Sequence, residues 1–147
     1  MLIAIAAIVL CLAVVLIVIM RMRRAKLELE ASSISPEALH LLIEDNKKVL
    51  IFDIRQPLDL LAYSEIIPGS VRIPPKELLE NPALIPQDED AVVYCTCAGE
   101  KTSREVVHHA RMLNFMRLKL LRGGLNAWKA MGYPVERYDK PFHLDTV

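Results

Sequence analysis

The first twenty residues form one unbroken apolar run, and this run restricts how the whole chain can be organised. It contains no charged residue, and all 18 Lys and Arg and all 18 Asp and Glu follow it. About 20 helical residues, each rising roughly 1.5 Å, match the thickness of a membrane's hydrocarbon core. We therefore expect residues 1–20 to form a transmembrane helix that contacts the membrane through residues 2–20.

Basic residues follow the apolar run directly and predict its orientation. Arg21, Arg23, Arg24 and Lys26 lie on its C-terminal flank, and no Lys or Arg precedes it. Because basic flanks stay in the cytoplasm, we expect a single-pass protein of the cell membrane whose soluble domain faces the cytoplasm. A cleaved signal peptide is the alternative, but it needs a basic segment before a shorter apolar stretch. Residues 21–34 are interpreted as a charged juxtamembrane linker.

Composition excludes several classes for the rest of the chain. The formal net charge is 0 and the isoelectric point is about 6.9. A nucleic-acid-binding domain normally carries a basic excess, so no nucleic-acid partner is expected. The 3 cysteines are too few to staple a small secreted domain.

Apolar segments alternate with segments of helical character over residues 35–138, and residues 139–147 form a tail. The segments 49–55 and 91–95 are nearly continuous apolar runs, typical of strands buried on both faces. Further strands are expected at 71–73 and 118–121, and helices at 36–44, 57–63, 76–80, 103–113 and 125–131. This alternation predicts an α/β fold, a parallel sheet with helices on both faces.

The loop after the strand 91–95 is the candidate functional segment. Ligands of such sheets bind beyond the carboxyl ends of the strands. Two thiols, Cys95 and Cys97, lie here just before a helix. Thr102 and Glu105 have the spacing of a capping box at the start of that helix.

The surroundings of these thiols favour the thiolate, which is the nucleophilic form of cysteine. A helix start carries positive potential, and backbone N–H groups that curl around a sulfur form an anion pocket. Lys101 and Arg104 add full positive charges. The candidate catalytic residues are Cys95 and Cys97, and the candidate substrate-binding residues are Thr96, Ala98, Gly99, Glu100, Lys101, Thr102 and Arg104.

Five segments, in this order, resemble the rhodanese-like (sulfurtransferase) domain family over residues 34 to about 136. They are the opening helix at 34–39, the strand 49–55 ending in Asp-x-Arg, the turn and strand at 67–74, the strand 92–95, and the Gly-Gly-x-x-x-Trp segment at 121–128 with Gly-Tyr-Pro-Val at 132–135. The resemblance implies a rhodanese-like parallel sheet. It also implies that a loop cysteine takes sulfur from a donor such as thiosulfate, becomes a persulfide and passes the sulfur on.

The resemblance places Cys95 as the nucleophile and the loop amides as the group that holds the donor. It implies a small anionic sulfur donor and a thiol acceptor as partners. No cofactor is expected. Cys95, Cys97 and a histidine could hold a soft metal ion, but no further ligand is evident, so no metal is expected. The resemblance leaves any protein partner open.

The loop departs from the family pattern, so alternatives stay open. The family's commonest loop has Arg where this chain has Glu100. Counted from Cys97, rather than Cys95, the loop length fits without a gap, so either thiol is a candidate nucleophile. A phosphatase of this fold needs an Arg to clamp phosphate, and Lys101 substitutes poorly. The alternative function is a catalytically weak or inactive module for protein interaction or thiol redox sensing at the membrane.

Other polar and glycine residues have structural interpretations. Asp53 and Arg55 are expected to form a charge pair that ties down neighbouring loops. The adjacent His108 and His109 are expected on a solvated helix face. The pair at 123–124 is expected in a tight turn with positive φ that borders the pocket. The stripe of Leu125, Trp128 and Met131 is expected in the core.

Overall fold

The structure is a computed structural model that describes residues 2–96 and 101–141, with the side chains of residues 2–9, 29 and 101 left aside. The chain divides into two compact units, Met1–Ser32 and Ser33–Val147. Each unit is described by itself.

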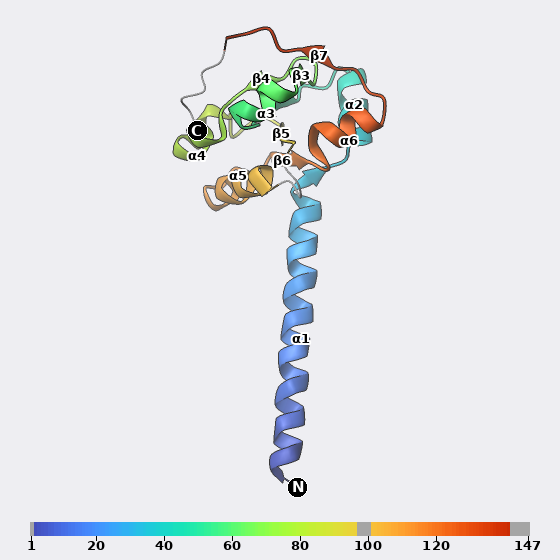
Figure 1. The fold of residues 1–147 in the computed structure, drawn as a ribbon. Helices are drawn as coiled ribbons and strands as arrows, with labels where there is room; N and C mark the ends of the chain where they lie inside the picture. The colour runs from blue at the N-terminus through green and yellow to red at the C-terminus, as the bar shows by residue number, and fades with distance from the viewer. Residues whose placement is uncertain (1, 97–100, 142–147) are drawn as a thin grey trace. The chain divides into compact units, whose positions relative to one another are not determined.

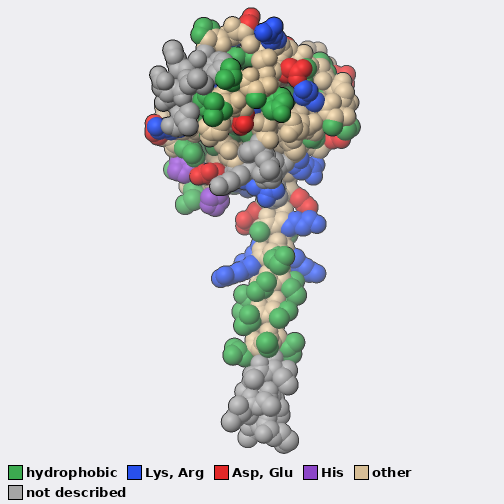
Figure 2. Space-filling model, viewed as in Figure 1, with side chains coloured by type: hydrophobic (Ala, Val, Ile, Leu, Met, Phe, Trp, Pro, Cys, Tyr) green, Lys and Arg blue, Asp and Glu red, His purple; other side chains and the backbone are tan. Residues whose placement is uncertain are grey.

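The first unit is a helix, α1, which runs over Leu2–Ala31 and includes the charged segment that follows the apolar run. Its described side chains between Leu10 and Met20 are all exposed, and Figure 2 shows them as a green section of the helix next to the basic residues. Among the residues that the structure describes, no helix meets the length and apolarity needed to cross a membrane. The transmembrane helix expected from the sequence is therefore not supported by the structure.

The second unit alternates strands and helices, as predicted. Its strands are β1 (Ser33–Ile34), β2 (Leu50–Asp53), β3 (Glu65–Ile66), β4 (Val71–Arg72), β5 (Ala91–Tyr94), β6 (Leu118–Leu121) and β7 (Glu136–Arg137). Its helices are α2 (Pro36–Glu44), α3 (Pro57–Ala62), α4 (Pro75–Glu80), the 3-10 turn η1 (Pro82–Leu84), α5 (Lys101–Met112) and α6 (Gly124–Ala130).

The main sheet has the order β1-β6-β5-β2-β4, and all its pairs are parallel. β5 therefore lies in the centre between β6 and β2. Phe52 pairs with Val93 and Asp53 with Tyr94, so the carboxyl ends of β2 and β5 lie side by side. The strands β3 and β7 form a separate antiparallel pair. The predicted α/β fold with a parallel sheet is confirmed.

Alternating side chains of the central strand β5 pack into two apolar layers, one on each face of the sheet. Val92 and Tyr94 belong to a buried cluster with Leu39 of α2 and Trp128 of α6. The opposite face includes Val93, which is fully buried. On that side α5 packs on β6 and on α4. In Figure 1, α2 and α6 lie on one side of the sheet and α4 and α5 on the other.

Capping at α2 follows from the sequence, whereas capping at α5 does not. The Ser35 hydroxyl accepts a hydrogen bond from the Ala38 N–H at 3.2 Å, and Pro36 opens α2. Helix α5 already includes Lys101, a good helix former, so Thr102 lies inside the first turn. The predicted helix start at residue 103, directly after Thr102, is therefore wrong by two residues.

Candidate functional site

The candidate site lies at the carboxyl edge of the sheet, where β2 and β5 end next to each other. Asp53 is the last residue of β2, and Cys95 follows the last residue of β5. The Ile54 N–H donates to the Tyr94 carbonyl oxygen at 3.0 Å, and this hydrogen bond holds the two strand ends in register. The first residue beyond each strand therefore starts from a fixed position.

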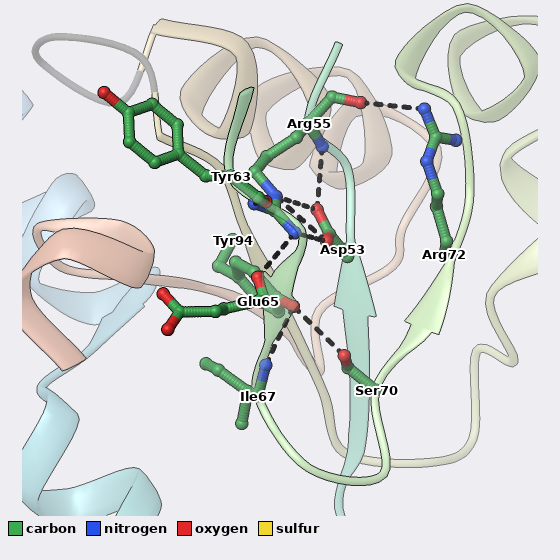
Figure 3. A network of polar contacts seen from close by, with 8 residues as sticks. All are labelled: Asp53, Arg55, Tyr63, Glu65, Ile67, Ser70, Arg72 and Tyr94. Carbon is green, nitrogen blue, oxygen red and sulfur yellow. Dashed lines mark hydrogen bonds and ion pairs between the residues drawn. The ribbon is translucent and has the colours of Figure 1, made fainter. Parts of the chain in front are cut away.

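A buried ion pair closes the end of β2. Arg55 Nε donates to both carboxylate oxygens of Asp53 at 2.9 Å, and the Arg55 backbone N–H donates to Asp53 Oδ1 at 3.0 Å. Both residues are 0 % exposed. The predicted charge pair is therefore present, and its charges face each other rather than solvent (Figure 3).

The same guanidinium ties down the segment that follows α3. Arg55 Nη1 donates to the Tyr63 carbonyl oxygen at 2.7 Å, and Nη2 donates to that of Glu65 at 2.9 Å. Burial lowers the pKa of Arg55, but the hydrogen bonds and negative charge of Asp53 outweigh burial and raise that pKa above its usual value. Arg55 therefore stays charged and acts as a structural clamp between β2 and β3.

The Tyr94 hydroxyl joins the end of β5 to the turn before β4. It accepts a hydrogen bond from the Ile67 N–H at 3.2 Å and lies 3.0 Å from the Ser70 hydroxyl oxygen. Burial, followed by the negative charge of Asp53, raises the pKa of Tyr94 well above its usual range. Tyr94 is therefore a neutral structural residue that fixes the strand directly before Cys95.

Cys95 is buried, with 2 % of its surface exposed, and its backbone is held by the start of α6. The Leu125 N–H donates to the Cys95 carbonyl oxygen at 3.1 Å. Gly123 and Gly124 both have positive φ, +71° and +55°, so the expected turn is confirmed. A Cβ on Gly124 would lie 2.0 Å from the Cys95 carbonyl oxygen, so the turn borders the candidate site as expected.

The structure describes some of the other predicted site residues. Thr96 is half-buried directly after Cys95, Thr102 is half-buried in the first turn of α5, and Arg104 is exposed on that helix. Lys101 is the first residue of α5. Cys97, Ala98, Gly99 and Glu100 lie outside the described residues.

Other expectations have mixed outcomes. His108 and His109 are exposed, as predicted for a solvated face. Leu125 and Trp128 are buried core residues, but Met131 is 48 % exposed, so its placement in the core is wrong. Met131 follows the last residue of α6, where the helical periodicity no longer holds. Among the described residues, no three His, Cys, Asp or Glu side chains form a metal-binding group.

The sequence does not show that Gly124 and Leu125 contact the Cys95 backbone. The Gly-Gly pair after an apolar strand was the signal, and it indicated a turn. Its partner could not be read from the sequence, because the contact joins segments that are far apart along the chain.

These features define a class of protein: a parallel α/β domain that carries a cysteine at the carboxyl end of its central strand. The sequence profile described as the Rhodanese-like domain matches residues 35–131. The chain therefore belongs to the rhodanese-like domain family.

Relatives share this domain at modest identity. A sulfurtransferase of Allochromatium vinosum is 29 % identical over 104 residues, which are 71 % of this chain and 94 % of the relative. The probable adenylyltransferase/sulfurtransferase MoeZ of Mycobacterium tuberculosis is 27 % identical over 108 residues, which are 71 % of this chain but only 26 % of that longer protein. The crystal structure of a rhodanese-related protein from Thermoplasma volcanium has a TM-score of 0.59 and 27 % identity, and the match covers 71 % of this chain and 96 % of that one.

Proposed function

We propose that this chain is a sulfurtransferase that moves sulfane sulfur through a persulfide on Cys95. The observation that carries the proposal is the position of the Cys95 thiol, at the carboxyl end of the central strand of a rhodanese-like domain. Ligands bind at this edge of parallel sheets. The family and its sulfurtransferase relatives support the reaction class.

The proposed reaction has two steps, and the Cys95 thiolate is regenerated. The thiolate attacks the outer sulfur of thiosulfate, a sulfur–sulfur bond forms on Cys95, and the bond to the sulfonate group breaks to release sulfite. A thiolate acceptor or cyanide then attacks the outer persulfide sulfur, and the electron pair of the broken bond returns to Cys95. No external oxidant or reductant is needed.

The groups that follow Cys95 are proposed to bind the anionic donor. They are the loop residues Thr96, Ala98, Gly99 and Glu100, and the helix residues Lys101, Thr102 and Arg104. Backbone N–H groups of such a loop would stabilise the charge on the donor and on the persulfide. Cys97 remains the alternative nucleophile.

A cyanide assay on the full chain in detergent tests the proposal. Thiosulfate and cyanide should yield thiocyanate, and Cys95→Ser should reduce the rate to background. Cys11→Ser is the matched control, because residue 11 lies in α1, and it should leave the rate unchanged. Loss of activity in Cys97→Ser with activity kept in Cys95→Ser would move the nucleophile to Cys97. No thiocyanate from the unmodified chain would favour the inactive-module alternative.

We also propose that residues 2–20 anchor the chain in the cell membrane, with the domain on the cytoplasmic side. The sequence supports this through its uncharged run and the basic residues Arg21, Arg23 and Arg24. The exposed apolar side chains from Leu10 to Met20 also support it, since a surface of this kind calls for an apolar environment.

Fractionation of cells that express the full chain tests the anchor. The chain should remain in the membrane pellet after an alkaline carbonate wash, and added protease should digest the domain only after the cytoplasmic side is opened. Val14→Arg with Val15→Arg should release it, because each charge at the middle of a span costs about 2.5–3.5 kcal/mol. The matched control, Val14→Leu with Val15→Leu, should stay in the pellet. Release of the unmodified chain by the wash would contradict the anchor.

A further inference from the structure

We infer that Gly124 is a positioning residue for the proposed nucleophile: its missing side chain lets the start of α6 fix the Cys95 backbone. This inference rests on the proposed function, because it assigns Gly124 a part in placing the reactive sulfur. Gly124 itself touches neither donor nor acceptor in this account.

The backbones of Gly124 and Cys95 approach each other closely. A Cβ on Gly124 would lie 2.0 Å from the Cys95 carbonyl oxygen, 3.1 Å from its carbonyl carbon and 3.6 Å from its nitrogen. All these atoms belong to the main chain, so no side chain can rotate away. Any residue other than glycine at position 124 must therefore displace either the turn or Cys95.

Buried contacts of α6 hold the turn at Gly124 in place. Leu125 and Trp128, which follow Gly124 in α6, are each 1 % exposed in the core. The Trp128 indole Nε1 also donates to the Pro134 carbonyl oxygen at 2.8 Å. Because α6 is held by these contacts, a clash at Gly124 is expected to move Cys95.

The contact with α6 also affects the first amide of the candidate loop, the Thr96 N–H. The Leu125 N–H holds the Cys95 carbonyl at 3.1 Å. In a trans peptide the C=O and the following N–H point in opposite directions, so this bond also sets the direction of the Thr96 N–H. A shift at Gly124 would therefore change both the position of the Cys95 thiol and the direction of the Thr96 N–H.

The test compares three glycine variants in the full chain, each measured for thiocyanate production and for thermal stability. Gly124→Ala should lower kcat by about a hundredfold, since a misplacement near 1 Å costs that much, and kcat should fall more than KM rises. Gly132→Ala is the control for backbone strain, because Gly132 has φ +74° and nothing within 4 Å of its added Cβ. Gly123→Ala is the control for a clash in the same turn, since its Cβ would meet the Ala127 side chain at 2.4 Å.

A second readout does not depend on sulfur transfer. Alkylation of Cys95 by iodoacetamide is followed against pH, with the modified residue located by fragment mass spectrometry. In Gly124→Ala the pH midpoint of Cys95 alkylation should rise, because the Thr96 amide is displaced. Both control variants should keep the midpoint of the unmodified chain. A chain that transfers no sulfur would refute the proposed function, while this comparison would still decide the role of Gly124.

The inference is overturned if Gly124→Ala matches Gly132→Ala in kcat and in the alkylation midpoint. It is also overturned if Gly123→Ala shows the same changes at the same loss of stability, because Gly124 would then be merely structural. If Gly124→Ala does not fold, a measurement on the unmodified chain tests the contact between Cys95 and the start of α6. Alkylation of Cys95 should then shift the amide NMR signal of Leu125, and an unmoved signal would refute the inference.

Discussion

Two neighbouring strands of the sheet, β2 and β5, end at the same edge, and the residues that follow them are held in different ways. The end of β2 is fixed through side chains, because the Arg55 guanidinium binds Asp53 and the carbonyl oxygens of Tyr63 and Glu65. Cys95, the first residue after β5, is fixed through its main chain, because its carbonyl accepts the Leu125 N–H and lies against Gly124.

Because of this difference, we expect Arg55 to contribute to the stability of the fold and Cys95 to contribute to the reaction. Each nitrogen of the buried Arg55 guanidinium donates a hydrogen bond within the domain, which stabilises this edge of the sheet. Its positive charge faces the Asp53 carboxylate. The backbone contacts of Cys95 fix its position, and in the proposed function its thiol is the reacting group. Substitution of Arg55 should therefore mainly reduce stability, whereas substitution of Cys95 should mainly reduce activity.

The largest effect is expected at Cys95. Cys95→Ala should reduce thiosulfate-dependent sulfur transfer to background, since no sulfur remains there to form the persulfide. The loss of one small side chain should lower the free energy of unfolding much less than the substitution of Arg55 does. Turnover and urea unfolding of the same sample measure both effects. Full activity in Cys95→Ala would contradict the role of Cys95 as the nucleophile.

The next effect is a loss of stability at Arg55. Arg55→Ala leaves the buried Asp53 carboxylate without its counter-charge, and breaking such a pair costs about 3–5 kcal/mol. Urea unfolding measures the change. Arg122→Ala, at an exposed arginine, is the matched control and should change little. A loss of activity in Arg55→Ala without any loss of stability would show that this residue acts on the substrate.

A smaller loss is expected from Tyr94→Phe. The hydroxyl accepts the Ile67 N–H and bonds the Ser70 hydroxyl, and a buried polar group left without its partner costs about 1–3 kcal/mol. Ser70→Ala, which keeps the bond from Ile67, should cost less. An equal loss in both variants would contradict this account of the Tyr94 hydroxyl.

Tyr94 also predicts a dependence on alkaline pH. Its pKa in the folded chain is raised, first by burial and then by the charge of Asp53. The unfolded chain therefore loses the Tyr94 proton first, and the stability that Tyr94 provides is complete below about pH 10 and declines above it. Urea midpoints between neutral and alkaline pH should fall less steeply in Tyr94→Phe. Identical slopes in the two chains would refute the assignment.

The smallest effect is expected at the opposite edge of the sheet. Asp90, directly before β5, accepts a hydrogen bond from Arg117 Nε at 3.0 Å, and both side chains are exposed. This bond and the charge of Arg117 hold the pKa of Asp90 below its usual value. Its contribution should vanish as the pH falls through that lowered pKa, and added salt should weaken it. Asp90→Asn should therefore change the unfolding midpoint least of all.

The parts of the fold that the sequence predicts are those with a strong local signal. The apolar runs at β2 and β5 are typical of strands buried on both faces, so their strand character is clear from the sequence alone. Ser35 and Pro36 mark the start of α2 in the same local way. The strands β1, β3 and β7 have only 2 residues each and were not predicted, because pairing with distant segments creates them.

The candidate site shows the same division. The position of Cys95 after an apolar strand follows from the sequence, and so does the structural role of Asp53 and Arg55. The carbonyl partners of Arg55 and the contact of Gly124 with Cys95 depend on how distant segments pack, so no local pattern predicts them.

Mass spectrometry of the full chain after incubation with thiosulfate tests the central claim most directly. The account predicts that the chain gains the mass of one sulfur atom, that fragmentation places this atom on Cys95, and that cyanide removes it. A chain that gains no sulfur, or that carries the added sulfur on another cysteine, would contradict the account.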